Sequence, residues 1–354
     1  MRGAVLKNGD GLNGVLKIFL KKALKGEVVD GVMVHTAGPD GTFPWNYVTG
    51  MEFLEDSVPA PPVMPLQGAR ALASVAGTDR EDRILAVMRP CEARASVELA
   101  KLEQIELDNI IILTMECGGV VPLDIYGKEG VTGPDPQRRE TLRPLCRQCV
   151  EFSGGGDLTV AKTDSGFALV PLTEKGKDLT RELGMKTEND LSLWTRRMRK
   201  LRGERIEIRQ EAERDLRDEY GGLDGLTKAF SGCVSCRSCR TVCPICYCSL
   251  CFIDMKDRRS PAWERLDRSS ESGAARLKSN TLLFHIGRMA HMSLSCVSCG
   301  MCEDACPADI PIGRLVSMAS SGTADLFDYS AGADPESPVP LNTFLLEELH
   351  EYED

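Results

Sequence analysis

Two runs of cysteines are the residues of this chain whose types and spacing most clearly indicate chemistry. Each run has the form Cys-x-x-Cys-x-x-Cys-x-x-x-Cys-Pro, and the runs extend from Cys233 to Pro244 and from Cys296 to Pro307. This spacing holds two 4Fe-4S clusters, and the fourth cysteine of each run binds the cluster of the other run. The pattern therefore predicts a carrier of single electrons.

The crossed arrangement predicts two ligand sets in a ferredoxin-like segment. The first set is Cys233, Cys236, Cys239 and Cys306, and the second set is Cys243, Cys296, Cys299 and Cys302. Zinc is a weaker alternative, because structural zinc sites favour cysteine pairs separated by about a dozen residues or more. Disulfides are weaker still, because the N-terminal residues lack the features of a secretory signal.

Four further cysteines precede the runs, and they are Cys91, Cys117, Cys146 and Cys149. Cys91 follows an apolar strand expected at 83–88, and Cys117 follows another expected at 109–115. Sites in open α/β sheets gather beyond the carboxyl ends of strands. Four thiolates that meet there would hold a third 4Fe-4S cluster. The alternative is that Cys91 and Cys117 are buried as small hydrophobic residues.

The last three cysteines, Cys246, Cys248 and Cys251, closely follow the first run. Thiols at these positions can replace a ligand of the neighbouring cluster, join another centre or pack as free side chains. On spacing alone, the choice between Cys243 and Cys246 as a ligand stays open.

The elements that position these cysteines have an α/β rhythm over residues 1–185. Strands are expected at 28–35, 83–88 and 109–115, and helices at 15–24, 68–76 and 92–102. A charged helical linker is expected at 186–230, a helical two-cluster ferredoxin-like domain at 231–330 and an acidic tail at 331–354. The linker is typical of a solvated helix, and the alternative is an electrostatic docking surface. The fold class is thus α/β or α+β with a second, helical domain.

Composition excludes several classes of protein. The chain has 354 residues, of which 42% are hydrophobic and 27% are charged, as in ordinary globular proteins. Its net charge of −10 and its aromatic content of 5% disfavour nucleic-acid binding. No apolar run has the length of a membrane span. Fifteen cysteines without an export signal indicate metal ligation in a reducing cytoplasm, in an anaerobic setting.

Several segments resemble the beta-subunit family of coenzyme F-420 hydrogenases and dehydrogenases, in particular beta subunits of formate dehydrogenases. The matching segments are residues 9–24, Val29-Asp-Gly-Val-Met-Val34, Arg89-Pro-Cys-Glu-Ala-Arg94, Cys117-Gly118, Cys146-Arg-Gln-Cys149, Cys243-Pro-Ile-Cys-Tyr-Cys-Ser-Leu-Cys251 and Phe284-His-Ile-Gly-Arg-Met-Ala-His291. The resemblance covers residues 5–315 and leaves out the acidic tail.

This resemblance implies FAD in the α/β domain, a hydride exchange between that flavin and a deazaflavin, and a third cluster on the four early cysteines. It also implies a separate catalytic alpha subunit of the formate dehydrogenase or hydrogenase type. A flavin suits the junction because it handles both hydrides and single electrons. Two groups of glycines are candidates for approaching it, namely Gly9, Gly11 and Gly14 and the pair Gly118 and Gly119. Plain turns are the alternative for both groups.

Three charged or titratable residues, His285, Arg288 and His291, lie near one helical face before the second run. Arg288 is a candidate for raising the potential of a cluster, and the alternative for all three is local hydrogen bonding. His35 ends a strand, where packing is the expected role.

The leading hypothesis is a flavin and iron–sulfur electron-transfer subunit of an oxidoreductase complex that serves a soluble hydride carrier. The alternative is a wiring module of a heterodisulfide reductase-type assembly, with no reaction of its own.

Overall fold

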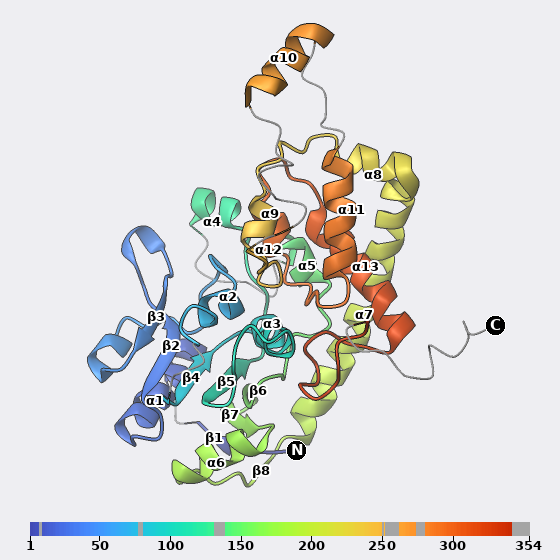
Figure 1. The fold of residues 1–354 in the computed structure, drawn as a ribbon. Coiled ribbons are helices and arrows are strands. Elements are labelled where there is room, and N and C mark those ends of the chain that lie inside the picture. The colour runs from blue at the N-terminus through green and yellow to red at the C-terminus, as the bar shows by residue number, and fades with distance from the viewer. Residues whose placement is uncertain are drawn as a thin grey trace, which may run out of the picture.

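A computed structural model describes residues 1–6, 9–76, 81–130, 139–249, 251, 262–273 and 280–341. Figure 1 shows an α/β part beside a helical part that contains the cysteine runs. The long helix α7 (Ser192–Tyr220) contacts both parts, because it packs on strand β6 at one end and on helices α8 and α13 at the other. The predicted fold class, a mixed α/β domain joined to a helical cluster domain, is confirmed.

The α/β part contains one eight-stranded sheet with the order β3-β2-β4-β5-β6-β7-β1-β8. The strands are β1 (Arg2–Val5), β2 (Gly31–His35), β3 (Trp45–Val48), β4 (Ile84–Val87), β5 (Ile110–Met115), β6 (Leu158–Thr163), β7 (Gly166–Pro171) and β8 (Asn189–Asp190). The central strands β2, β4, β5 and β6 are parallel, and every other pairing is antiparallel. Strand β8 extends the sheet past the boundary expected at residue 185.

Helices cover both faces of the sheet, because its central strands alternate their buried side chains between the two faces. Leu85 and Leu113 pack in one core with helices α1 (Gly11–Lys25) and α6 (Glu174–Glu182). Ala86 and Ile112 pack in the other core with α2 (Gly68–Leu72) and α3 (Pro90–Lys101). The helices and strands predicted along residues 15–115 are confirmed, with small differences at their ends.

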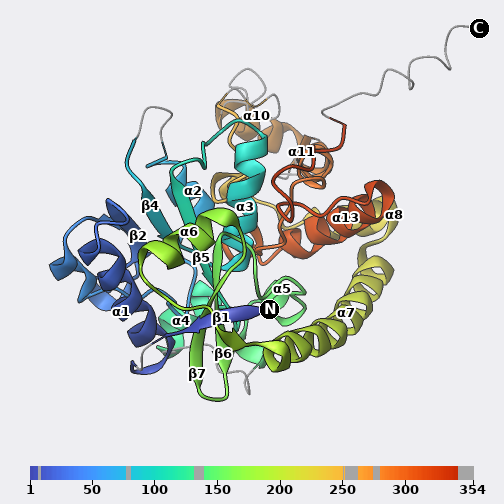
Figure 2. The same cartoon turned by 90° about the horizontal axis from the view of Figure 1, so that it is seen from below.

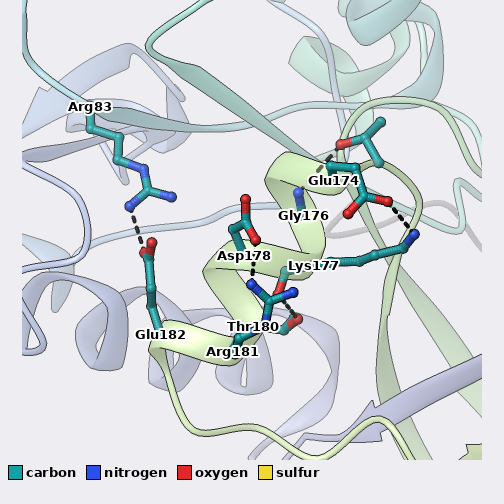
Figure 3. A network of polar contacts seen from close by, with 9 residues as sticks. Arg83, Glu174, Gly176, Lys177, Asp178, Thr180, Arg181 and Glu182 are labelled. Atoms are coloured by element: carbon teal, nitrogen blue, oxygen red, sulfur yellow. Dashed lines mark hydrogen bonds and ion pairs between the residues drawn. The ribbon is translucent and has the colours of Figure 1, made fainter.

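Helix α6 packs on the sheet through the buried Leu179, and its outer side has a capped N-terminus and a row of surface ion pairs (Figure 3). Thr173 accepts a hydrogen bond from the Gly176 amide at 3.3 Å. At the other end, Arg83 reaches from the start of β4 to Glu182 at 2.6 Å. These pairs are exposed, so each contributes at most about 1 kcal/mol.

The helical part has its own core, centred on Phe230, Phe284 and Leu315. Its helices are α8 (Gly222–Phe230), α9 (Ser238–Thr241), α10 (Ala262–Ser272), α11 (Asn280–Met292), α12 (Met301–Asp304) and α13 (Ile312–Phe327). The short helices α4 (Leu123–Glu129) and α5 (Pro144–Arg147) connect the sheet to this part, and the 3-10 turns are Pro39–Gly41, Met51–Leu54 and Arg139–Thr141. Much of the expected acidic tail, residues 342–354, lies outside the described residues. Within the described ranges, no helix is long and apolar enough to cross a membrane.

The two parts are joined where the segment after α13 packs on α3 (Figure 2). The buried carboxylate of Glu98 accepts hydrogen bonds from the Tyr329 hydroxyl and the Gly332 amide, both at 2.6 Å. Gly332 has φ +65°, and a Cβ there would lie 2.1 Å from the Arg94 carbonyl oxygen. The close approach therefore requires glycine.

Candidate metal centres

The four early cysteines meet at one end of the sheet. Cys91 lies in the first turn of α3, just after β4, and Cys117 follows β5. Since β4 and β5 are neighbouring parallel strands, both cysteines emerge at the same edge. Helix α5 and the residues after it bring Cys146 and Cys149 to the same place, and all four cysteines line one cavity.

The walls of this cavity fit a group that binds thiolates. Gly119, with φ +104°, lets its amide lie 3.4 Å from Cys117 Sγ, and a Cβ there would lie 3.1 Å from Cys146 Cβ. Burial raises the pKa of the Cys117 and Cys149 thiols above the usual range, and neighbouring thiols add to this effect. Thiols in such an environment ionise only when a cation compensates them, as iron does in a cluster.

A second cavity collects the first ferredoxin-type set, whose members are Cys233, Cys236, Cys239 and Cys306. The Cys236 side chain is exposed, so this cavity lies at the surface. His285 stacks on Phe230, with ring centroids 4.0 Å apart, and its Nε2 lies 3.3 Å from Cys233 Sγ. Burial lowers the pKa of His285 to about 4, so the ring is neutral at pH 7 and its Nε2–H tautomer can donate to the thiolate.

The second ferredoxin-type set lies between the other two. The thiols of Cys243, Cys296, Cys299 and Cys302 are close enough for their charges to interact. Cys246 donates a hydrogen bond to Cys243, which lowers the pKa of the Cys243 thiol. Cys246 Sγ also lies 3.4 Å from Met292 Sδ. Both thiols adjoin the middle set, and the assignment of Cys243 as its ligand stays a prediction. Cys248 is exposed.

The three sets follow one another in space. Cys299, a member of the middle set, also lines the cavity of the early cysteines. Cys302 of the middle set and Cys239 of the surface set both lie beside the Arg288 guanidinium. The order is therefore the early set, then the middle set, then the surface set. Among the described residues, no three His, Cys, Asp or Glu side chains converge as they would on a single metal ion.

The first glycine group does not lie at these cavities. Gly9 packs against the first turn of α1, where a Cβ would lie 2.6 Å from the Gly14 carbonyl carbon, and Gly11 has φ +67°. A steric contact at Gly9 and a left-handed backbone conformation at Gly11 therefore each favour glycine. Of the second pair, Gly119 lines the cavity of the early cysteines, and Gly118 is exposed beside it.

A surface groove of about 600 Å³ lies beside the middle set and was not anticipated from the sequence. Strand β3 and helix α2 form it, with Phe43, Trp45 and Tyr47 on one side and Arg70 on the other. Arg70 Nη1 lies 3.5 Å from the Cys243 carbonyl oxygen, so the groove adjoins the middle set. The sequence signal that could have revealed it is the aromatic cluster at residues 43–47, in a chain with few aromatics.

His35 packs beside this groove. Its ring lies 3.7 Å from the Trp45 ring, and its Nδ1 lies 2.8 Å from the Phe43 carbonyl oxygen. Burial, with a smaller contribution from the Arg89 charge, lowers the pKa of His35 to about 3. The neutral, packed ring agrees with the structural role expected for it.

Comparison with known proteins supports the same organisation. A family model described as a 4Fe-4S dicluster domain matches residues 229–310, which contain both runs. The F420-dependent formate dehydrogenase subunit beta of Methanocaldococcus jannaschii is 25% identical, with 93% of this chain and 94% of that protein covered. The F420-dependent formate dehydrogenase 1 subunit beta of Methanococcus maripaludis is 26% identical, with 96% and 95% covered.

Among solved structures, a chain of the F420-reducing [NiFe] hydrogenase complex from Methanosarcina barkeri is 15% identical, with 60% of this chain and 87% of that chain covered and a TM-score of 0.46. The two formate dehydrogenase relatives match over nearly their whole length. The chain is therefore similar, over nearly its whole length and not only in its cysteine segments, to beta subunits of F420-dependent formate dehydrogenases.

Proposed function

We propose that this chain is an iron–sulfur flavoprotein subunit of a formate dehydrogenase-like oxidoreductase. It passes electrons between a catalytic subunit and a soluble hydride carrier. The observation that carries the proposal is the series of three thiol sets, which begins at the edge of the sheet and ends at the surface. The names of the two relatives, F420-dependent formate dehydrogenase beta subunits, support a deazaflavin as the carrier.

Each thiol set suits a 4Fe-4S cluster, which takes four cysteine thiolates. Two buried arginines beside the sets have N–H groups without partners among the described residues, namely Nε of Arg143, and Nε and Nη1 of Arg288. Cluster sulfur atoms accept such hydrogen bonds. The buried thiols and the unpartnered N–H groups beside them therefore suit bound clusters better than they suit a purely apolar core.

The flavin is assigned to the groove lined by Trp45, Tyr47 and Arg70. Its volume of about 600 Å³ lies within the usual range for ligand sites. Its aromatic wall suits a flat ring, and its contact with Cys243 through Arg70 supports a ring bound beside the middle set. A bound flavin would convert a two-electron hydride transfer into single-electron steps. The residues of this chain would hold the flavin ring beside the series of thiol sets.

Metal and flavin analysis after anaerobic reconstitution tests the proposal. Three clusters predict about twelve irons per chain, and one FAD should copurify or bind. The variant Cys91→Ser should lose about four of these irons. Cys248→Ser is the matched control, because Cys248 is exposed and belongs to no set, so it should retain all of them. A wild-type chain with eight irons would exclude the cluster on the early cysteines.

The wiring-module alternative shares the three thiol sets and differs only in lacking a flavin reaction. Reduced deazaflavin separates the two functions when it is added anaerobically to the reconstituted chain. Bleaching of a flavin band followed by cluster reduction is the expected result. Full cluster loading with no flavin and no response to reduced deazaflavin or to NAD(P)H would replace the proposed function with the wiring module.

A further inference from the structure

Each junction between neighbouring thiol sets contains one buried arginine. Arg143 lies between the early and middle sets, with its charge beside Cys146 and Cys299. Its side chain is 1% exposed, and its Nη1 donates to the Cys299 carbonyl oxygen at 2.9 Å. Its Nη2 lies 2.5 Å from an oxygen of Asp304, which is itself 3% exposed. The carboxylate of Asp304 therefore balances the charge of Arg143 locally.

Arg288 occupies the next junction without such a partner. It is 3% exposed on α11, and its Nη2 donates to the Cys239 carbonyl oxygen at 2.9 Å. Among the described residues, no carboxylate forms an ion pair with Arg288, and its Nε and Nη1 have no hydrogen-bond partner. The groups that face it are the thiols of Cys239, Cys243, Cys246 and Cys302.

An unpaired guanidinium is costly to bury, so a compensating negative charge is expected beside it. The only anionic groups within reach among the described residues are cysteine thiolates of the surface and middle sets. A thiolate-bound cluster becomes more negative each time it accepts an electron. The attraction of Arg288 for both clusters is therefore strongest when they are reduced.

We propose that Arg288 is an unneutralised cation shared by the two ferredoxin-type clusters, and that it raises the reduction potential of both. Arg143 has little such effect, because Asp304 balances it. Electrons entering the chain are thereby held at the ferredoxin-type pair rather than at the early cluster. Arg288 would act on the clusters only through its charge, and it would take no part in the reaction itself. This inference rests on the proposed function, since it requires that the clusters assemble.

Redox titration of the full, anaerobically reconstituted chain, followed by EPR, tests the inference. In Arg288→Met, the equilibrium constant for reducing two of the three clusters should fall at least tenfold, which is 59 mV for a one-electron couple. The reduction potential of the cluster on the early cysteines should not change. Arg288→Lys keeps the charge and should stay near the wild-type potentials. Arg181→Met, which removes an exposed arginine on α6, is the matched control and should change nothing.

A second variant keeps the inference testable if Arg288→Met does not retain its clusters. Asp304→Asn removes the charge that balances Arg143, so the potentials of the early and middle clusters should rise. Full iron loading of Arg288→Met with unchanged potentials would overturn the inference, as would Asp304→Asn with unchanged potentials. Failure of the wild-type chain to bind iron would instead overturn the proposed function.

Discussion

The buried ion pair between Arg143 and Asp304 connects the α/β part to the helical part, and we expect its loss to destabilise their packing more than the loss of any other single contact. The two residues lie 161 positions apart in the chain, and their side chains are 1% and 3% exposed. Arg143 also bonds to the Cys299 carbonyl, and Asp304 accepts from the Leu123 amide at 3.3 Å. The variant Asp304→Ala removes the carboxylate and leaves a buried guanidinium without a counter-charge.

The expected cost is about 3–5 kcal/mol, the range for removing one partner of a buried pair. The unpaired Arg143 dominates this cost, because its Nε already has no partner among the described residues. The measurement is urea unfolding of the reconstituted chain under anaerobic conditions, followed by far-UV circular dichroism. Asp178→Ala, which breaks the exposed pair with Arg181, is the control and should cost at most about 1 kcal/mol.

A hydrophobic double variant checks the reasoning behind this number. Arg143→Met combined with Asp304→Leu removes both charges and fills similar volume, so it should recover most of the lost stability. If Asp304→Ala unfolds at the wild-type urea concentration, the pair does not hold the two parts together. If the double variant is as unstable as the single one, packing rather than charge explains the loss.

Three further perturbations follow from the structure. Gly119→Ala forces a side chain at φ +104° and 3.1 Å from Cys146 Cβ, so iron content should fall by about one cluster while the other two remain; unchanged iron would show that the loop adapts. Trp45→Ala should lower FAD content with iron unchanged, as absorbance and metal analysis would show, and full FAD would move the flavin out of the groove. The folded-state pKa of His35, about 3, lies below its unfolded value of 6.5, so the folding stability that it contributes is present above pH 6.5 and lost as the pH falls. At pH 5 this loss is roughly 2 kcal/mol, and His35→Asn should flatten the dependence in urea unfolding between pH 7 and pH 5; an equally steep dependence in the variant would assign the effect to other groups.

The sequence predicted the fold class and the main elements because their signals are local. Apolar runs such as residues 109–115 and the helix start at Arg89-Pro90 depend on neighbours within a few residues. The grouping of Cys91 with Cys117 was also within reach, since adjacent parallel strands end at a common edge. Whether these thiols hold a cluster stays a prediction.

Features made by distant segments could not be predicted in this way. The groove requires β3 and α2 to lie side by side, and no local sequence signal shows that these two elements are neighbours. The same holds for the contact of Glu98 with Tyr329, which joins α3 to the segment after α13. The glycines at positions 9, 11 and 14 were candidates for approaching the flavin. Gly9 and Gly11 also have local backbone reasons for being glycine, and a contact with the flavin stays a prediction.

The two arginines show why cysteine spacing determines which thiols meet but not how the clusters differ in energy. Arg143 and Arg288 are both buried beside cluster ligands, and on residue type alone they are equivalent. The difference lies in Asp304, which reaches Arg143 from α12 and has no counterpart at Arg288 among the described residues. Because a buried charge acts over its surroundings unless a second charge cancels it, the placement of one carboxylate decides which junction favours the electron. If the three thiol sets hold clusters as proposed, their relative potentials depend on tertiary contacts. A chain with the same cysteine pattern but with Asp304 at another position would then order its clusters differently.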